Sequence, residues 1–340
     1  MKPRGPLFFM LLWFAFAAAP AAAQTPAPAG GESLGQLRNR LQALRQSFPG
    51  NMSIYMKNLS TGDEIALDAD TVYETFSVIK LAIAAEVLRQ SEAGKFSLND
   101  RITLTPADRR LPSGVLYAMD GGLRPTVRDL LTLMIIISDN EATDVLASKV
   151  GRENVTAYMH RLGLKNTSIR FSDLDWDRTW LGSLDPAYQH ASGDETVEFP
   201  FGKYSDAQVT AAFGHTIYHA GIYFGHSTTR EIGQLLEWAA EGKLVTKGAS
   251  RLLLNTMEKQ QVNDRFPRYL QDVRIAHKTG DGQPFIANDA GVLWVRGEPI
   301  VLVVFTGHHR GPTAPLHDSI ARVAALVVRH YGGNPTPDFK

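Results

Sequence analysis

The chain has 340 residues with 35 basic and 35 acidic side chains, so its formal net charge is zero. This balance offers no basic surface for nucleic acid, and we expect nucleic acid neither as a partner nor as a substrate. The sequence contains no cysteine, which excludes disulfides, thiolate metal sites and a cysteine nucleophile, so the fold must be held together by its hydrophobic core.

The first residues have the features of a secretory signal. Lys2 and Arg4 precede an apolar stretch at 7–19, and three alanines form an A-x-A site before Gln24. The apolar run is too short to cross a bilayer. We therefore expect a signal peptide at 1–23, export to the periplasm or beyond, and no membrane anchor after cleavage; a retained anchor is the less favoured alternative.

The rest of the chain has strand patterns at its two ends and helical patterns between them. After an Ala/Pro/Gly-rich linker at 24–33, the order is helix 34–48, strands 53–56 and 64–67, helices 78–88, 126–137, 141–150, 153–162, 227–240 and 249–257, strands 273–278, 290–295 and 300–306, and helix 320–331. This order predicts an α+β fold, in which an antiparallel five-stranded sheet is built from both termini, flanked by the terminal helices and interrupted by an inserted helical subdomain.

We expect one catalytic domain at 34–335. Its sheet lobe would take about 34–70 and 245–335, its helical lobe about 71–244, and the active site would lie at the seam between them. We expect a monomer.

The string S-V-I-K at 77–80 has the residues of a nucleophile and its base. Lys80 is the one charge in the apolar run 78–85, so its ammonium must find partners or lose its proton. Ser77 lies one helical turn away, at a helix start that favours a developing anion. The pair therefore suits nucleophilic catalysis. A helix-capping serine beside a lysine that reaches the surface is an equal alternative.

Two further strings follow, S-D-N at 138–140 and K-T-G at 278–280. Ser138 can pass a proton to a leaving nitrogen, and Asn140 can hold both a lysine and a substrate amide. Taken alone, the first string is more simply a capped helix start. Lys278 and Thr279 can bind a substrate carboxylate, and Gly280 leaves room for substrate backbone; alone, this string equally fits an edge strand ending in a hairpin turn.

With these three strings in this order, the chain resembles the penicillin-recognising serine hydrolases, and among them the class A β-lactamases. The resemblance extends over nearly all of the chain after residue 23. It implies that Ser77 is acylated, that Lys80 is its base or relay, that Ser138 is the proton shuttle, and that Asn140 anchors substrate and lysine. Lys278 and Thr279 would hold a carboxylate, and the backbone N–H groups of Ser77 and Asp281 would form the oxyanion hole.

One part of the family's pattern is missing. Class A enzymes carry a glutamate in an E-x-x-L-N string that positions the hydrolytic water, and this chain has no such string. Counting forward from Ser138 places Asp173 where the glutamate would be. An aspartate can serve as that base if its loop moves inward, but a solvated loop of surface acids is the more frequent meaning of such a segment.

The segment 171–226 also departs from the family. It is longer than the family's usual loop and lacks clear structure in the sequence, so we expect a loop that covers the substrate cleft. His215 and His219 lie four residues apart, but no acidic third ligand is identifiable, and we expect no metal and no cofactor. The strand arginine that binds the carboxylate in many class A enzymes has Ala290 as its counterpart, with Arg310 as a weak substitute.

Three functions are compatible with these residues. The leading one is a serine hydrolase that acylates on Ser77 and hydrolyses β-lactams. The others are a D,D-peptidase or esterase of the same fold, and a β-lactam or peptidoglycan sensor that deacylates slowly. The expected partner is in each case a small β-lactam or a peptidoglycan-like molecule.

Overall fold

The computed structural model describes residues 32–219, 224–336 and 339. The predicted signal peptide at 1–23 and most of the linker lie outside the described residues. Within the described part, no helix is both long and apolar enough to cross a membrane.

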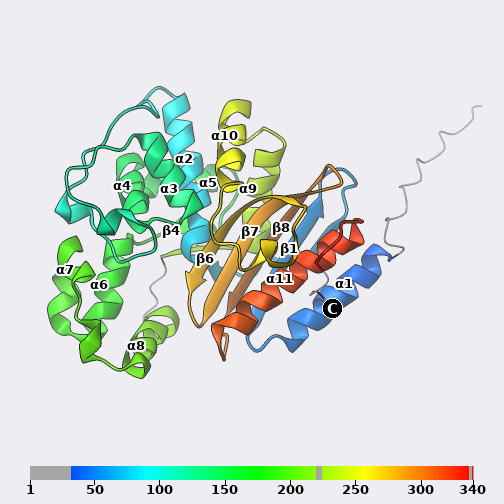
Figure 1. The fold of residues 1–340 in the computed structure, drawn as a ribbon. Helices are drawn as coiled ribbons and strands as arrows, with labels where there is room; N and C mark the ends of the chain where they lie inside the picture. The colour runs from blue at the N-terminus through cyan, green and yellow to red at the C-terminus, as the bar shows by residue number, and fades with distance from the viewer. Residues whose placement is uncertain (1–31, 220–223, 337–338, 340) are drawn as a thin grey trace, which may run out of the picture.

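A five-stranded antiparallel sheet forms the centre of the fold (Figure 1). Its strands stand in the order β2-β1-β8-β7-β6, so the two ends of the chain meet where β1 pairs with β8. The strands are β1 (Asn51–Asn58), β2 (Glu64–Leu67), β6 (Arg274–Gly282), β7 (Ile286–Val295) and β8 (Glu298–Gly307). The predicted α+β class, with a sheet made from both termini, is confirmed.

The terminal helices cover one face of this sheet. Helices α1 (Leu34–Ser47) and α11 (Thr313–His330) lie side by side across it (Figure 1). Their apolar residues, such as Leu37, Leu41 and Ile320, are fully buried with Leu302 and Val304 of β8. Helix α11 begins seven residues earlier than predicted, because Pro315 stands in its first turn, where no backbone N–H donor is required.

The middle of the chain is helical, with a small three-stranded sheet in the order β3-β5-β4. Those strands are β3 (Tyr73–Glu74), β4 (Ser168–Ile169) and β5 (Gly225–Ser227). The helices are α2 (Lys80–Glu92), α3 (Val127–Ile136), α4 (Asn140–Val150), α5 (Arg152–Arg161), α6 (Asp173–Leu184), α7 (Gly193–Val197), α8 (Asp206–His219), α9 (Thr229–Ala240) and α10 (Lys247–Met257).

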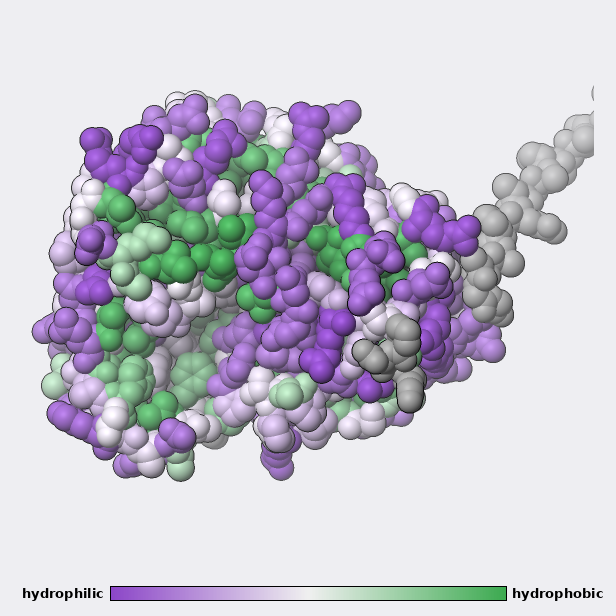
Figure 2. All heavy atoms as spheres, viewed as in Figure 1, coloured by the Kyte–Doolittle hydropathy of each residue, from purple (hydrophilic) through white to green (hydrophobic). Residues whose placement is uncertain are grey.

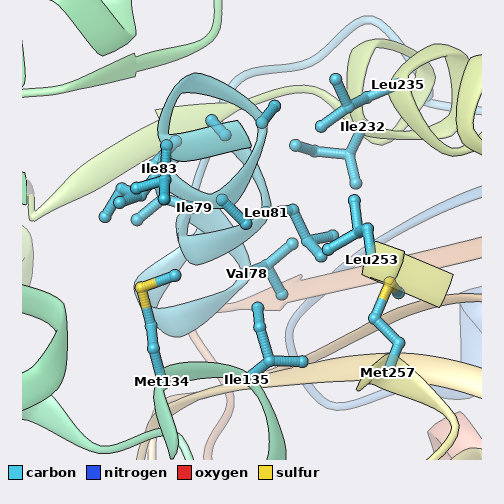
Figure 3. Packing of buried hydrophobic residues seen from close by; sticks show 14 of the residues in the cluster. Val78, Ile79, Leu81, Ile83, Met134, Ile135, Ile232, Leu235, Leu253 and Met257 are labelled. Atoms are coloured by element: carbon cyan, nitrogen blue, oxygen red, sulfur yellow. The ribbon is translucent and has the colours of Figure 1, made fainter. Parts of the chain in front are cut away.

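Helix α2 is the central packing element of this part. Its side chains Leu81 and Ile83 are fully buried. Figure 3 shows Ile135 of α3 close to Val78, just before α2, with Leu253 and Met257 of α10 beside them and Ile232 and Leu235 of α9 further along the helix. Each fully buried side chain of this size contributes about 1.5–3 kcal/mol by removal from water. Packing on several sides therefore fixes the position of the residues at the N-terminal end of α2.

Candidate active site

A pocket of about 560 Å³ brings all three motifs together. It lies between the edge strand β6, the N-terminal end of α2 and the segment α6 to α8. The surface is hollowed in this part of the molecule, between the α6–α8 side and the sheet (Figure 2). Residues from each predicted motif line it: Ser77, Ser138, Asn140, Asp173, Thr279 and Asp281.

Ser77 stands in a short 3₁₀ turn, Phe76–Ile79, that leads into α2. The prediction of an α-helix from residue 78 was therefore early by two residues, since α2 begins at Lys80. Phe76 has a positive φ of 43°, a conformation that costs roughly 1–3 kcal/mol for a residue with a side chain. This strained entry to the turn places the partly buried Ser77 in the pocket.

Lys80 is fully buried and held by the S-D-N turn rather than by Ser77. Its Nζ donates to the backbone oxygen of Ser138 at 2.7 Å, to Asn140 Oδ1 at 2.8 Å and to Ser138 Oγ at 3.2 Å. Among the described residues no hydrogen bond joins Lys80 to the Ser77 hydroxyl. Burial lowers the pKa of Lys80, and the nearby carboxylate of Asp173 opposes this shift. Both effects are those expected of a proton relay beside a nucleophile.

The S-D-N turn is fixed by its own capping residue. Asp139 accepts from the backbone N–H groups of Ala142, Val115 and Leu116 at 2.8–3.0 Å, which ties the start of α4 to the loop before α3. Ser138 has φ of 60°, so this residue too is held in a left-handed conformation. The capping alternative is correct in part, because Asp139 caps α4 while Ser138 and Asn140 stay in the pocket.

The K-T-G string lies inside β6, not at its end as predicted. The ladder with β7 continues through the pairs Lys278↔Ala290, Asp281↔Ala287 and Gly282↔Ile286. Lys278 is fully buried, and its Nζ donates to Ser138 Oγ at 3.0 Å. Burial, followed by the positive charge of Lys80, holds the pKa of Lys278 well below its usual value. Lys80 and Lys278 therefore both contact Ser138, and the charge of Lys80 helps to lower the pKa of Lys278.

Gly280 is required by the approach of the 3₁₀ turn. A Cβ at this position would lie 2.4 Å from the backbone oxygen of Thr75 and 3.1 Å from the backbone nitrogen of Val78. This contact fills the direction in which a Cβ would point, and the expected approach of substrate backbone along the strand stays a prediction. Gly280 thus lets β6 lie directly against the turn that carries Ser77.

Asp173 is buried at the start of helix α6. It is 8% exposed, and its backbone N–H donates to Asp144 Oδ1 of α4 at 2.9 Å. The expectation of a solvated loop of surface acids is therefore wrong at this residue. Burial raises the pKa of Asp173 to about 7, while the positive charge of Lys80 acts in the opposite direction. A carboxylate with this pKa suits a general base near neutral pH.

The segment 171–226 is largely helical where the structure describes it, instead of an unstructured loop. Its helices α6 and α8 are joined by an aromatic cluster, in which Phe213 lies 5.5 Å from Trp180 and 6.0 Å from Trp176, both edge to face. The spacing of apolar residues in this segment is weak, so periodicity did not reveal its helices. Trp176, Trp180, Phe201 and Phe213 line the pocket and give it an aromatic wall.

We expected no metal at His215 and His219 of α8. The side chain of His219 lies outside the described part of the structure. Among the side chains that the structure describes, no group of three or more metal-binding residues occurs, and the expectation stays a prediction. The proposed substitute for the strand arginine, Arg310, is exposed and is absent from the described residues that line the pocket.

Sequence reasoning missed Arg265, a fully buried arginine at the pocket. Its guanidinium donates to the backbone oxygens of Asn288 at 2.7 Å and Gly280 at 3.3 Å, and it pairs with the carboxylate of Asp281. It therefore places a fixed positive charge behind β6. No local motif marks this residue, because it contacts β6 only through the tertiary fold.

Asp177 was also missed. It is 6% exposed, lines the pocket and lies four residues after Asp173 on α6. Helical spacing of two acids at i and i+4 was the available signal, but it carried no weight while the segment was expected to be a loop.

Together these residues can form and break an acyl bond. Ser77 can supply a hydroxyl nucleophile, Lys80 and Ser138 can form a buried proton path, and Thr279 lines the pocket next to the buried Lys278. Such a constellation defines a serine acyl-transfer enzyme of the S-x-x-K type.

The chain belongs to the beta-lactamase enzyme family, whose model matches residues 36–331. A beta-lactamase from Streptomyces lavendulae is 26% identical over 305 residues, covering 86% of this chain and 86% of that protein. The crystal structure of a beta-lactamase from Sphaerobacter thermophilus shares the fold, with a TM-score of 0.70, 22% identity and coverage of 88% of this chain and 97% of that chain.

An ancestral class A beta-lactamase structure also shares the fold, with a TM-score of 0.68, 22% identity and coverage of 86% and 99%. The resemblance to the class A enzymes is confirmed.

Proposed function

We propose that this protein hydrolyses β-lactams through an acyl-enzyme on Ser77. One observation carries the proposal: Lys80 and Lys278, far apart in the sequence, both donate to Ser138 Oγ in the pocket that Ser77 lines. This arrangement gathers proton-transfer groups around Ser138. Membership of the beta-lactamase family supports a β-lactam as the substrate.

In the acylation step, Ser77 Oγ attacks the lactam carbonyl carbon and its proton passes to Lys80. The carbonyl oxygen becomes an oxyanion, which the backbone N–H groups of Ser77 and Asp281 stabilise. The C–N bond then breaks, and Ser138 delivers a proton from the lysine pair to the leaving nitrogen. Lys278 and Thr279 hold the substrate carboxylate, and Asn140 holds its amide.

Deacylation requires a base for water, and we assign this role to Asp173. Water attacks the ester carbon, its proton moves to Asp173, and the bond to Ser77 Oγ breaks as that oxygen regains a proton. The raised pKa of Asp173, caused by burial, keeps it basic enough to accept this proton at neutral pH. We also propose that the mature protein acts after export, on the basis of the signal-like residues 1–23.

The test compares wild type, Ser77→Ala and the control Ser91→Ala, which alters the far end of the same helix. Turnover of a chromogenic cephalosporin is followed together with the intact mass of the protein. Rapid turnover that disappears only in Ser77→Ala supports β-lactam hydrolysis. A stoichiometric adduct without turnover would replace it with a sensor, and the lack of any adduct would indicate an ester or peptide substrate.

A further inference from the structure

A second pocket of about 300 Å³ lies beside the S-D-N turn. Ser138 and Asn140 line the active-site pocket, whereas the next residue along the chain, Glu141, lines this second one. The two pockets share no lining residue among those that the structure describes. The walls of the second pocket, which we call the Glu141 pocket, come from segment 104–123, the first turn of α4 and the first turn of α7. No step of the proposed reaction uses it.

Glu141 brings a carboxyl group without a partner to this pocket. The residue is 4% exposed, and its Oε2 atom is buried with no hydrogen bond to any described residue. The two arginines that act on its charge are engaged elsewhere, because Arg110 pairs with Asp144 at 2.5 Å and Arg109 pairs with Asp194 at 3.0 Å. A buried carboxyl oxygen normally has a hydrogen-bond donor, so this oxygen indicates a ligand that supplies one.

The charges around Glu141 favour a cationic ligand. Burial raises the pKa of Glu141 to about 7, and the negative charge of Asp139 adds to this effect. The charged groups that act on Glu141 or line its pocket are four acids and two arginines: Asp108, Asp120, Asp139, Asp194, Arg109 and Arg110. Acids therefore predominate around Glu141, so an anion would be repelled, whereas a bound cation would favour the ionised form of Glu141.

The walls of the Glu141 pocket are largely apolar. Leu104 and Leu116 line it as buried side chains, while Met119 and Leu123 line it and are 48% and 37% exposed. Exposed apolar side chains beside a pocket favour a ligand with a hydrocarbon part. A calcium or magnesium ion fits poorly, because it needs about six oxygen ligands and no group of three or more metal-binding side chains occurs in the described part of the chain.

We propose that the Glu141 pocket binds an organic ammonium ion with an aliphatic chain. The ammonium group donates to the Glu141 carboxylate, and the chain lies along Leu104, Leu116 and Met119. This ligand satisfies the unpartnered oxygen and covers the exposed apolar rim at the same time. The site is distinct from the active-site pocket, so the inference holds whichever substrate acylates Ser77.

The experiment titrates hexylammonium chloride into the protein at pH 8, where most of the Glu141 carboxyl group is ionised, and measures the heat of binding. Wild type is compared with Glu141→Gln and with the control Glu153→Gln, which alters an exposed glutamate on α5. Hexan-1-ol, which has the same chain without the charge, is the matched ligand.

We expect a dissociation constant in about the millimolar range for wild type and the control, since the ligand has few atoms. Glu141→Gln should weaken binding of hexylammonium at least about tenfold, because it removes a charge-assisted hydrogen bond. Hexan-1-ol should bind wild type at least about tenfold more weakly than hexylammonium for the same reason. Equal affinity of wild type and Glu141→Gln, or of the ammonium and the alcohol, would overturn the inference.

A second measurement locates the ligand in wild type, so it does not depend on how a variant folds. The active-site pocket also holds buried carboxyl groups and an aromatic wall, so it is the competing position for the same ion. Backbone amide resonances of Leu116, Met119 and Glu141 should shift on titration with hexylammonium and saturate at the calorimetric dissociation constant, while those of Trp176 and Phe213 should not. Shifts confined to Trp176 and Phe213, or no saturating shift at the Glu141 pocket, would overturn the inference. Failure of Ser77 to form an adduct would leave this test unaffected.

Discussion

Replacing Gly280 by alanine should disable acylation without unfolding the protein. The added Cβ would lie 2.4 Å from the backbone oxygen of Thr75, whereas ordinary contacts begin at 3.4 Å, so β6 or the 3₁₀ turn must move by about 1 Å. We expect this displacement to cost about 1–3 kcal/mol of stability. Because Ser77 and the Asp281 N–H group lie on the two segments that separate, acylation should slow by about 100-fold.

The assay is single-turnover acylation of a chromogenic cephalosporin, with thermal unfolding measured on the same samples. Gly121→Ala is the matched control, because a Cβ at Gly121 has no heavy atom within 4 Å. The control should acylate at the wild-type rate. If Gly280→Ala does so too, then the close contact between β6 and the turn does not set the geometry of Ser77, and the reasoning is refuted.

Three further predictions concern single side chains of the same pocket. Burial raises the pKa of Asp173 to about 7 from an ordinary 3.8, so the folded state binds this proton more tightly than the unfolded state does. The stabilisation of the folded state by this proton is complete below pH 3.8 and is lost as the pH rises through 7. In urea unfolding, the free energy of unfolding of Asp173→Asn should therefore exceed that of wild type by roughly 1–3 kcal/mol at pH 8 and by a smaller amount at pH 4.5. The same difference at both pH values would contradict the raised pKa of Asp173. Arg265→Ala should lower the free energy of unfolding by about 3–5 kcal/mol, because it empties a fully buried position and removes a donor from the backbone oxygens of Gly280 and Asn288. The control Arg310→Ala should change the free energy of unfolding little, and equal effects of the two variants would remove Arg265 from this role. Phe201, stacked on Trp180 at 5.9 Å, should favour substrates with aromatic acyl groups. Phe201→Ala should therefore lower kcat/KM for those substrates severalfold relative to substrates without an aromatic acyl group. An unchanged ratio of the two kcat/KM values would contradict a role for the aromatic wall in substrate choice.

The residues of the chemistry were predictable because they stand in short strings whose members act locally. Ser77 and Lys80 are one turn apart, and Ser138 and Asn140 flank one capping aspartate. Each string alone left a structural alternative open, but the order of the strings with K-T-G predicted one shared pocket. The sheet was predictable for a similar reason, since β-branched runs at both ends indicate strands and short turns indicate antiparallel neighbours. The observed sheet agrees with this prediction, because β8, β7 and β6 are consecutive neighbours and β1 from the other end of the chain pairs with β8.

The remaining features depend on tertiary contacts that leave little trace in the sequence. The glycines at 280 and 282 suggested the end of a strand, but both belong to β6 and pair with β7. A side chain at either position would collide with the turn at Thr75–Val78 or with the ring of Phe76, and this requirement for glycine is a tertiary contact. For Asp173, a candidate base, the sequence favoured the solvated-loop alternative, because its burial depends on contacts with α4 that the sequence does not reveal. Arg265 is linked to Asp281 only by the fold.

The most direct test of the account is rapid-quench mass spectrometry of the wild-type protein during turnover of a β-lactam, with the modified peptide sequenced. The account predicts a covalent adduct on Ser77 that forms and decays at least as fast as kcat. Turnover without an adduct on Ser77, or an adduct that outlasts many turnovers, would contradict it.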